Sequence, residues 1–241
     1  MPKEKPLISI ITPVYNEKEN ITWAIETIDK KLNYPYEVLV VYDFDEDNTV
    51  PVVKKLQKKF NYVRLVKNNL GRGVINAIRA GFKSAKGEII VVMVPDKADN
   101  PNTINKMYRK LQEGYDVVCA TRYTKGGKRI GGGALKSTLS RLAGLSTPFV
   151  LGIPTTDLTN SFKMYKKEVV NSIEIETDGG FEFAMELVIK AHNLGYKISE
   201  VPTVWRDRLY GISRFKLMKW LPKYGKLYFM GIKFRIQRLF S

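Results

Sequence analysis

The sequence contains a single cysteine and a single histidine among its 241 residues. One cysteine excludes a disulfide framework within the chain, so an intracellular location is the default expectation. Because Cys119 has apolar neighbours, we interpret it as a small core residue on a strand and not as a nucleophile. His192 falls in a helical pattern and is expected at the surface or at the boundary of the core, not as a catalytic group.

Long apolar runs are also absent from the sequence. No uninterrupted run is long enough to span a bilayer, and residues 1–6 lack the apolar segment of a signal peptide. A chain with this pattern is expected to lie on the surface of a membrane if it meets one at all.

Acidic residues are few relative to basic ones, because 24 Asp and Glu stand against 40 Lys and Arg and leave a net charge of +16. A surface of this kind attracts an anionic partner, which is a nucleotide, a nucleic acid or an acidic lipid headgroup. The net charge alone does not select one of the three.

Short apolar runs alternate with helical patterns along the first half of the chain. We expect strands over residues 7–13, 36–42, 62–66, 88–94 and 116–121. This alternation indicates an α/β fold with a mostly parallel, nucleotide-binding sheet flanked by helices. An edge strand that tolerates Pro202 is expected over residues 198–205. The length suits one sizeable domain with a small appendage.

The run over residues 88–94 reads as a strand buried on both faces, and it ends in a short acidic loop that contains Asp96 and Asp99. Open α/β sheets bind ligands beyond the carboxyl ends of their strands. Carboxylates there suit a divalent cation that keeps several waters and bridges to phosphates. The alternative is that Asp96, Asp99 and Asn100 only cap the helix that begins near Thr103.

Two more loops carry candidate features for binding a nucleotide. The strand over residues 36–42 is followed by four carboxylates in residues 43–47, which repel one another unless cations or hydrogen-bond donors are near. The segment Gly71-Arg72-Gly73 is a poor match to a dinucleotide fingerprint, because it lacks the third glycine at the required spacing. We therefore do not expect NAD to bind here.

Residues 125–133 form a basic, glycine-rich segment that is expected to be flexible and unpacked. A helix that carries Lys136, Ser140 and Arg141 follows it. The segment is either an ordinary surface loop or a mobile loop that closes over an anionic substrate.

The C-terminal stretch has Asp207 as its only acid after Trp205. Lysines recur at helical spacing, while aromatic and aliphatic residues fall on another side, and Pro222 is expected to start a second helix or to kink the first. A helix of this kind can lie in the plane of a bilayer and attract anionic lipid. The alternative is a helix that packs on its own domain or on a dimer partner. We divide the chain into a domain over residues 1–212 and a basic amphipathic helical tail over residues 213–241.

Five segments together resemble glycosyltransferase family two, and within it the polyprenyl-phosphate sugar synthases typified by dolichyl-phosphate mannose synthase. These segments are residues 8–21, 80–93, 121–127, 180–187 and 200–215. The resemblance implies a GT-A fold and an inverting transfer of a hexose from a UDP- or GDP-sugar. It also implies polyprenyl (dolichyl) phosphate or another lipid-linked acceptor, and dependence on Mg²⁺ or Mn²⁺.

The same resemblance implies roles for individual residues. The donor nucleotide sugar would be held by Pro13, Tyr15, Glu17, Asp43, Asp96 and Arg208. The acceptor phosphate would be held by Arg122, Lys136, Ser140, Ser213 and Arg214. Catalytic roles would fall on Asp157, Asp96 and Arg122. Lys136 stands where relatives often have arginine, so a bidentate contact becomes a point charge.

The metal motif departs from the family pattern. Asp96 matches the last acid of the Asp-X-Asp motif, but Val94 replaces the first acid. We assign Asp99 as the second metal carboxylate. If the acceptor is a phosphate monoester, Asp157 is expected to position a metal or a sugar hydroxyl, whereas a neutral hydroxyl acceptor would require Asp157 or Asp207 as a base.

These features predict a peripheral enzyme at the cytoplasmic face of a membrane, with the tail in place of the transmembrane helices of many relatives. Two alternatives keep a nucleotide-sugar site: transfer to a soluble glycan or protein, and binding without catalysis. A nucleic-acid binder is a third, but it leaves Asp43, Asp96, Asp99 and Asp157 without a purpose. No nucleic-acid partner is therefore expected.

Overall fold

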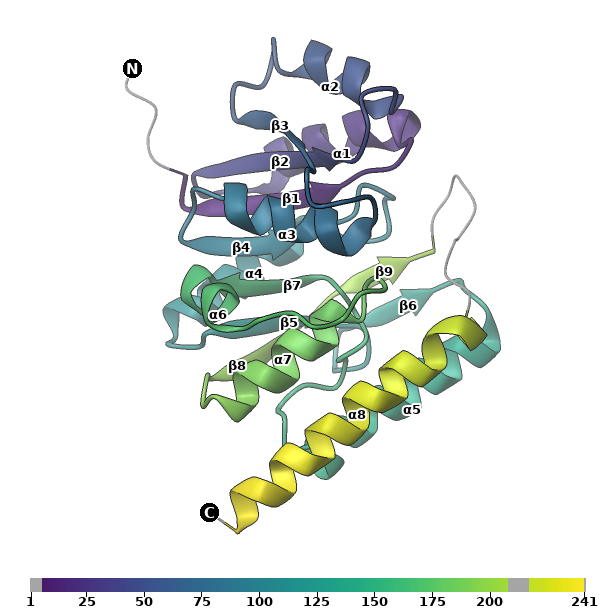
Figure 1. The fold of residues 1–241 in the computed structure, drawn as a ribbon. Coiled ribbons are helices and arrows are strands. Elements are labelled where there is room, and N and C mark those ends of the chain that lie inside the picture. Colours follow the sequence, from purple (N-terminus) through teal and green to yellow (C-terminus); the bar gives the residue numbers. More distant parts are fainter. Residues whose placement is uncertain (1–5, 208–216, 241) are drawn as a thin grey trace.

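The fold is built on a seven-stranded sheet with the strand order β3-β2-β1-β4-β7-β5-β8 (Figure 1). The computed structural model describes residues 6–207 and 217–240. The strands of the sheet are β1 Ile8–Pro13, β2 Tyr36–Tyr42, β3 Val63–Lys67, β4 Ile89–Val92, β5 Val117–Thr121, β7 Lys163–Lys166 and β8 Ile198–Pro202. All neighbouring pairs are parallel except those of β7, which runs antiparallel to both β4 and β5. The mostly parallel α/β architecture predicted from the sequence is confirmed.

Helices cover both faces of the sheet because successive strand residues alternate between two buried clusters. In β2, Val38 and Val40 pack with the cluster on one face, while Leu39 and Val41 pack with the cluster on the other. The first face is covered by α1 Lys18–Lys31, α2 Thr49–Leu56 and α4 Asn102–Gln112. The second is covered by α3 Val74–Ser84, α6 Lys167–Ser172 and α7 Phe183–Asn193. Cys119 is fully buried in this second cluster, as expected.

A second, two-stranded sheet lies beside the main one. The strand β6 Lys128–Ile130 pairs in parallel with β9 Val204–Arg206. The expected edge strand over residues 198–205 is therefore two strands, of which β8 forms the edge of the main sheet and contains Pro202. The expectation that residues 125–133 remain unpacked was wrong for β6, because its backbone bonds to β9 in spite of the glycines around it.

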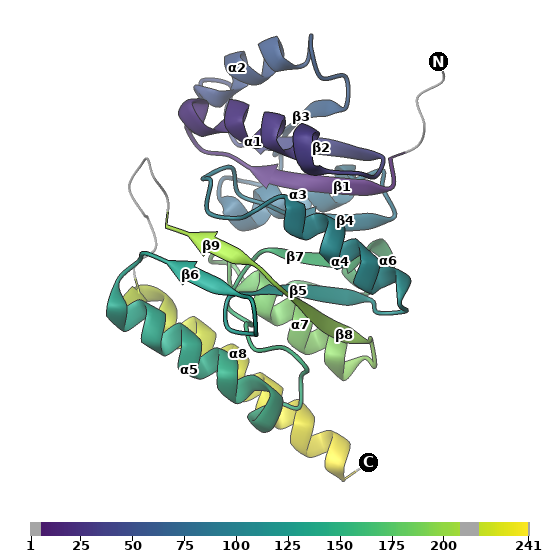
Figure 2. The same cartoon turned by 180° about the vertical axis from the view of Figure 1, so that it is seen from behind.

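The C-terminal helix α8 Leu217–Leu239 runs alongside α5 Ala134–Val150 in both views of the molecule (Figures 1 and 2). The Ser146 and Tyr228 hydroxyls are 2.6 Å apart, and a Cβ atom on Gly231 would come within 3.1 Å of the Leu151 side chain. Leu227 is buried in the same core as α7. The tail helix therefore packs on its own domain, which was one of the two alternatives.

Pro222 lies inside α8, which continues through it from Leu217 to Leu239. The expectation that Pro222 starts a second helix was wrong. Proline removes one backbone hydrogen bond, and the packing of α8 against α5 and α7 offsets this loss. Among the helices of the described residues, none combines the length and the apolar character needed to cross a membrane. The expected domain boundary at residues 212 and 213 lies outside the described residues.

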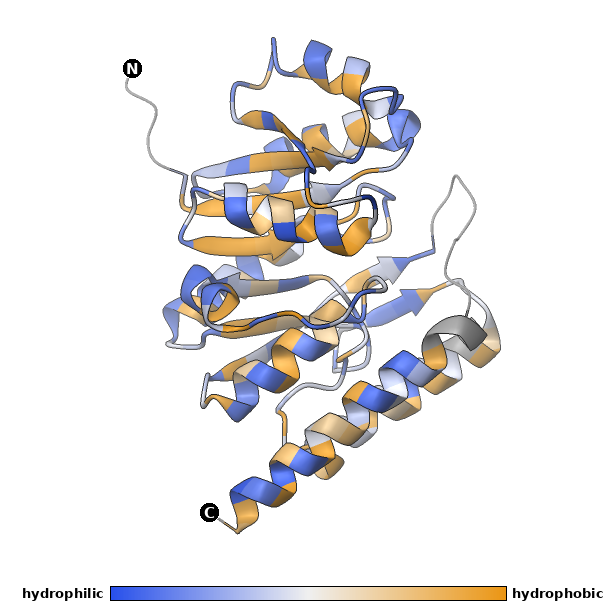
Figure 3. Ribbon diagram, in the orientation of Figure 1, coloured by the Kyte–Doolittle hydropathy of each residue, from blue (hydrophilic) through white to orange (hydrophobic). Residues whose placement is uncertain are grey.

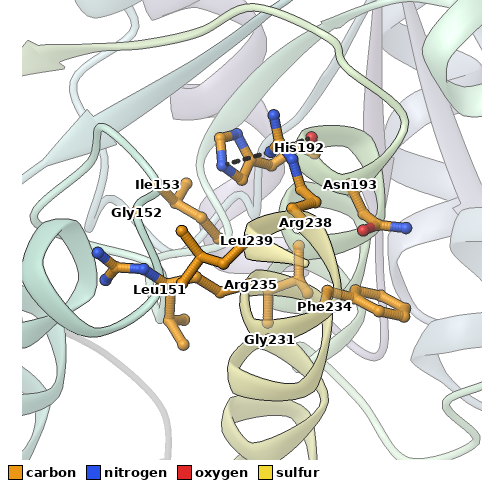
Figure 4. Close-up of a pocket in the computed structure, with 11 residues that line it drawn as sticks. Leu151, Gly152, Ile153, His192, Asn193, Gly231, Phe234, Arg235, Arg238 and Leu239 are labelled. Atoms are coloured by element: carbon orange, nitrogen blue, oxygen red, sulfur yellow. Dashed lines mark hydrogen bonds between the residues drawn. The ribbon is translucent and has the colours of Figure 1, made fainter. Parts of the chain in front are cut away.

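A cavity of about 340 Å³ lies between α7, α8 and residues 151–153 (Figure 4). Arg238 Nη1 is 3.0 Å from His192 Nε2 and donates to the His192 carbonyl oxygen at 3.2 Å. Arg235 donates to the Phe149 carbonyl oxygen at the end of α5. The two arginines therefore bind carbonyls in the last turns of α7 and α5, where a cation complements the helix dipole. His192 is half-buried, which agrees with its expected place at the boundary of the core.

Candidate active site

Pro13, Tyr15, Asp43, Asp96, Asp99 and Arg122 lie at one edge of the main sheet, where β1, β2, β4 and β5 all end. Parallel strands present their carboxyl ends at the same edge. The antiparallel strand β7 begins at this edge, because Lys163 pairs with Val92 at the end of β4. The turn that precedes β7 and contains Asp157 is therefore brought beside the loops after β4 and β5.

The loop after β2 forms the part of the site expected to bind the nucleotide. Asp43 accepts hydrogen bonds from the Gly73 N–H at 2.8 Å and from Asn68 Nδ2 at 2.7 Å. The Arg72 guanidinium carbon lies 5.1 Å from the centre of the Phe44 ring, and the exposed Tyr15 ring meets Phe44 edge-on. Asp43 and Tyr15 thus lie in one region, where aromatic faces and a cation could contact the nucleobase of a nucleotide.

Hydrogen-bond donors and a lysine satisfy the carboxylates that would otherwise repel one another after β2. Asp47 accepts from the backbone N–H groups of Asn16 at 3.0 Å and Thr49 at 2.8 Å, and Asp45 pairs with Lys67. The Glu17 N–H donates to Thr49 Oγ1 at 2.9 Å. These bonds join the turn after β1 to the loop after β2.

Glu17 and Pro13, two further residues of the expected donor site, lie on the β1 side of this region. Pro13 is the buried last residue of β1. Glu17 Oε2 accepts a hydrogen bond from Asn20 Nδ2 at 2.7 Å. Both residues therefore neighbour Tyr15 at the turn between β1 and α1.

The two acids after β4 are buried next to each other. Asp96 accepts the Ala98 N–H at 3.1 Å, while Asp99 Oδ1 has no hydrogen-bond partner among the described residues. Burial, together with the neighbouring Asp96 carboxylate, raises the pKa of Asp99 to about 8. Two neighbouring buried carboxylates repel each other, so a proton or a cation must reduce this repulsion for the arrangement to be stable.

The helix-capping alternative accounts for Asn100 but not for the two acids. Asn100 Oδ1 accepts the Asn102 N–H at 3.1 Å at the start of α4. The residue that caps α4 is Pro101, and the cap makes no side-chain hydrogen bond. The orphaned oxygen of Asp99 therefore lacks a structural role in α4.

The donor set of Asp96 and Asp99 fits a hard divalent cation such as Mg²⁺ or Mn²⁺. Within the part of the chain that the structure describes, no three His, Cys, Asp or Glu side chains are grouped as a metal site. Mg²⁺ commonly uses one or two carboxylates and takes its other oxygens from water and substrate phosphates. The buried, unpartnered oxygen of Asp99 is the observation that supports this fit.

Arg122 and Asp157 form a buried bidentate ion pair at the end of β5. Arg122 Nε is 2.7 Å from Asp157 Oδ2, and Nη2 is 2.8 Å from Oδ1. The Arg122 side chain is 8% exposed and that of Asp157 is 0% exposed. The Asp157 carboxylate raises the pKa of Arg122 against the effect of burial, so the guanidinium stays charged. Asp157 also accepts the backbone N–H groups of Arg122 and Asn160.

Ser140 on α5 joins this ion pair. Its hydroxyl is 3.1 Å from Arg122 Nη2, 2.9 Å from the Tyr123 hydroxyl and 2.7 Å from Thr159 Oγ1. Arg122 Nη1 makes no hydrogen bond to any described residue and remains available to a ligand. The structure thus brings together Arg122, Ser140 and Asp157, which are up to 35 positions apart in the sequence.

The remaining predicted phosphate-binding residues are described in part or not at all. Lys136 lies in α5, one turn before Ser140, and its side chain lies outside the described part of the structure. Arg208, Ser213 and Arg214 lie outside the described residues.

Lys163 is a residue of the site that the sequence did not reveal. It is fully buried at the start of β7, and its Nζ donates to the carbonyl oxygens of Leu158, at 3.0 Å, and Asn160. Burial lowers its pKa. These bonds hold the turn that carries Asp157. The signal was a lysine inside the otherwise apolar segment Phe-Lys-Met-Tyr.

Glu182 is a second buried group without an assigned role. Its carboxylate is fully buried, and neither oxygen has a hydrogen-bond partner among the described residues. Burial raises its pKa. Lys223 Nζ on α8 is 3.9 Å away, so this acid faces the start of the C-terminal helix.

Two known proteins are similar to this chain in sequence. The dolichol-phosphate mannosyltransferase of Pyrococcus furiosus is 31% identical over 214 residues, which cover 87% of this chain and 59% of that protein. The polyprenol monophosphomannose synthase of Mycolicibacterium smegmatis is 25% identical, with 95% of this chain and 88% of that protein covered. The chain spans less than two thirds of the length of the first of these relatives.

Two solved structures share the fold. A mannosyltransferase from Pyrobaculum calidifontis in complex with GDP-Man and Mn²⁺ has a TM-score of 0.66 at 20% identity, with 95% of this chain and 64% of that chain covered. A glucosyl-3-phosphoglycerate synthase from Mycobacterium tuberculosis in complex with Mn²⁺, UDP-glucose and phosphoglyceric acid has a TM-score of 0.65 at 17% identity, with 96% and 80% covered. These likenesses identify the fold as GT-A.

The match to a family model identifies the family of the chain. The model of the family described as glycosyl transferase family 2 matches residues 9–173, which hold β1 to β7 and every acid discussed at the sheet edge. With this match and the 31% identity over 87% of the chain, the protein belongs to glycosyl transferase family 2.

Proposed function

We propose that the protein is an inverting, metal-dependent hexosyltransferase that moves a sugar from a UDP- or GDP-sugar to polyprenyl phosphate or another lipid-linked acceptor. The observation that carries this proposal is the pairing of two sites at one sheet edge. A buried acid pair, Asp96 and Asp99, follows β4, and Arg122, in a buried ion pair with Asp157, follows β5. The names of two relatives, a dolichol-phosphate mannosyltransferase and a polyprenol monophosphomannose synthase, support the same acceptor class.

The donor would bind along the ends of β1, β2 and β4. Tyr15 and Asp43 would hold the base and ribose, and Asp96 and Asp99 would hold Mg²⁺ or Mn²⁺ beside the diphosphate. When bound, the cation supplies positive charge to the leaving diphosphate. Both carboxylates are about nine-tenths buried, so bulk water has little access to them.

The acceptor phosphate would bind at Arg122. Asp157 holds the guanidinium in one orientation, and Arg122 Nη1 then donates to a phosphate oxygen. A phosphate monoester is already ionised near neutral pH, so its oxygen attacks the sugar without a general base. Asp157 already accepts hydrogen bonds at both oxygens, which supports a positioning role and not a role as a base.

The assay combines purified protein with Mn²⁺, a panel of intact UDP- and GDP-sugars and a short polyprenyl phosphate. We expect transfer of one sugar and release of the nucleoside diphosphate, and loss of both after Asp96→Asn. A parallel series with soluble glycans and peptides separates the alternative acceptors. No transfer with any donor, although the donors remain intact, would contradict the proposal.

We also propose that α5 and α8 together lie on the cytoplasmic face of an anionic membrane. Both helices expose large apolar residues: Leu142 is 62% exposed, Phe149 is 80% exposed and Phe229 is 73% exposed. Figure 3 shows apolar and polar segments mixed along both helices. Leu135, Leu142 and Phe149 recur every seven residues and so share one face of α5. Ser140 lies on the opposite side of α5 and faces Arg122, so this arrangement would place the phosphate site about one helix diameter from the lipid surface.

Vesicle flotation tests the membrane proposal without removing a core helix. Phe149→Glu and Phe229→Glu are expected to abolish co-flotation with phosphatidylglycerol vesicles. Leu70→Glu, at an exposed leucine in the loop before α3, is the matched control and should float like the wild type. Flotation of all three variants would contradict the proposed surface.

A further inference from the structure

A basic cavity of about 390 Å³ lies between α5 and the small sheet of β6 and β9. Its lining includes Arg122, Lys128, Arg129 and Arg141, and none of its lining residues in the described part of the chain is acidic. Two acids lie close to the lining residues: Asp157 pairs with Arg122, and Asp207, which follows β9, has its Cβ close to Gly131. The cavity thus extends the Arg122 site toward a group of further cations.

The positive charge of this cavity does not come from Arg122. Asp157 neutralises that guanidinium through two hydrogen bonds of 2.7 and 2.8 Å. Among the described side chains, Lys128, Arg129 and Arg141 supply the net charge that an anion would meet. Lys128 and Arg141 are both exposed to solvent, which screens them, whereas Arg129 is half-buried.

Arg129 is held in place by the aromatic ring of Trp205. The two residues pair across the β6–β9 ladder, and the Arg129 guanidinium carbon lies 4.9 Å from the centre of the ring. The Arg122 guanidinium carbon lies 5.9 Å from the same centre. Both distances are in the range of cation–π attraction, so one ring fixes two guanidinium groups relative to each other.

Gly132 makes room for Arg129. Its φ of +85° is in the left-handed region, and a Cβ atom at this position would come within 2.6 Å of Arg129 Nη2. A side chain here would be strained by the backbone conformation and would require the end of the Arg129 side chain to shift. The glycine-rich segment before α5 therefore has a specific role beside this arginine.

The two phosphate groups of the proposed reaction differ in charge. A polyprenyl phosphate monoester carries nearly two negative charges near neutral pH, with a second pKa of about 6. The glycosylated product is a diester and carries one. A cation beyond the neutralised Arg122 therefore interacts more strongly with the acceptor than with the product.

We propose that Arg129, positioned by Trp205, is a further acceptor-binding residue that recognises the second negative charge of the phosphate monoester. It favours binding of the acceptor and release of the product. This inference rests on the proposed acceptor class.

Calorimetric titration of the full-length protein with farnesyl phosphate, a monoester, and farnesyl methyl phosphate, its diester, tests the inference. Near pH 8 we expect the wild type to prefer the monoester by about tenfold, in line with one added hydrogen bond to a charged group. Arg129→Gln should lose most of this preference through weaker binding of the monoester. Lys125→Gln removes the same charge from an exposed lysine nearby that does not line the cavity, and this variant should retain the preference.

Trp205 variants separate the position of Arg129 from its charge. Trp205→Leu should reduce the preference as Arg129→Gln does, although both arginines remain, and Trp205→Phe should restore it. A merely structural defect would instead weaken both esters and lower the melting temperature.

Four results would contradict these claims. An unchanged monoester preference in Arg129→Gln, or an equal loss in Lys125→Gln, overturns the role of Arg129. A wild-type protein that binds neither ester contradicts the proposed acceptor class, and with it this inference. A wild-type protein that binds both esters equally overturns the inference alone.

Discussion

The ion pair of Arg122 and Asp157 is the most constrained contact of the site. Asp157→Asn keeps the shape of the side chain but leaves a buried guanidinium without its counter-charge. Breaking one side of a buried pair costs about 3–5 kcal/mol of stability. We expect that loss in the free energy of unfolding by urea, together with a fall in sugar transfer.

Asp45→Asn is the control for this variant, because Asp45 pairs with Lys67 at an exposed site. Its free energy of unfolding should equal that of the wild type within error. A similar loss in both variants would mean that burial does not distinguish the two pairs.

The effect of Asp99 on stability should change sign when a metal binds. Asp99 should destabilise the metal-free protein and contribute to its stabilisation by metal. Burial and the neighbouring Asp96 raise the pKa of Asp99, which costs stability near neutral pH, so Asp99→Asn should raise the melting temperature without metal. Mn²⁺ at about 100 times its dissociation constant should stabilise the wild type by about 2.7 kcal/mol. We expect calorimetry to find little of this gain in the variant. An equal gain in both proteins would remove Asp99 from the metal site.

Sequence alone located most residues of the site but not the contacts between them. Asp96, Asp99, Arg122 and Asp157 follow strands or turns whose positions can be read from the apolar pattern. Lys163 was missed because its burial depends on two carbonyl oxygens of a turn, which no local pattern encodes. The stacking of Arg129 on Trp205 was missed because it requires β6 to pair with β9, across a long separation in sequence.

At the scale of elements, strands with continuous apolar runs were predictable and the others were not. The strands β1 and β4 are buried throughout and β2 is buried except at its two ends, whereas β7 has the sequence Lys-Met-Tyr-Lys. Charged residues at both ends of β7 hide a strand that is central in the sheet. The path of α8 through Pro222 could not be predicted either, because it depends on tertiary contacts with α5 and α7.

The close approach of α8 to the domain predicts unequal effects of two glycine substitutions. Gly231→Val places a β-branched side chain against Leu151, where a Cβ alone would be 3.1 Å away, and should cost about 1–3 kcal/mol. Gly225→Val in the same helix meets nothing within 4 Å and should change stability little. Urea unfolding of both variants is the measurement. Equal losses in the two variants would indicate that the close approach to Leu151 does not decide the outcome, because valine is a better helix former than glycine at both positions.

The contact between α7 and the end of α8 should make stability depend on pH. Burial and the adjacent Arg238 lower the pKa of His192. As pH falls below about 6.5, the unfolded state takes up a proton before the folded state does, so the stability that is complete above this pH declines. His192→Gln should show a smaller decline between about pH 7 and pH 5 in urea unfolding. An identical decline in both proteins would exclude this histidine as a source.

Part of the net charge of +16 lies on the side of the molecule that is formed by α5 and α8. Neither α5 nor α8 contains an acidic residue. Binding to anionic vesicles should therefore weaken, without vanishing, as salt rises from about 0.1 M to about 1 M, where the Debye length falls from roughly 10 to 3 Å. Flotation across this range measures it, and the apolar residues should retain a fraction of the protein. Salt-independent flotation would indicate that charge contributes nothing.

The central place of β7 has a consequence for biosynthesis. The strands β1 to β4 leave the ribosome early, but their inner edge at β4 stays open until residue 166 has been made and β7 can pair with it. During that interval the nascent chain presents a row of unpaired backbone groups on an apolar strand, which favours association with other chains. Translation arrest between β4 and β7 should therefore yield a product that requires a chaperone to stay soluble.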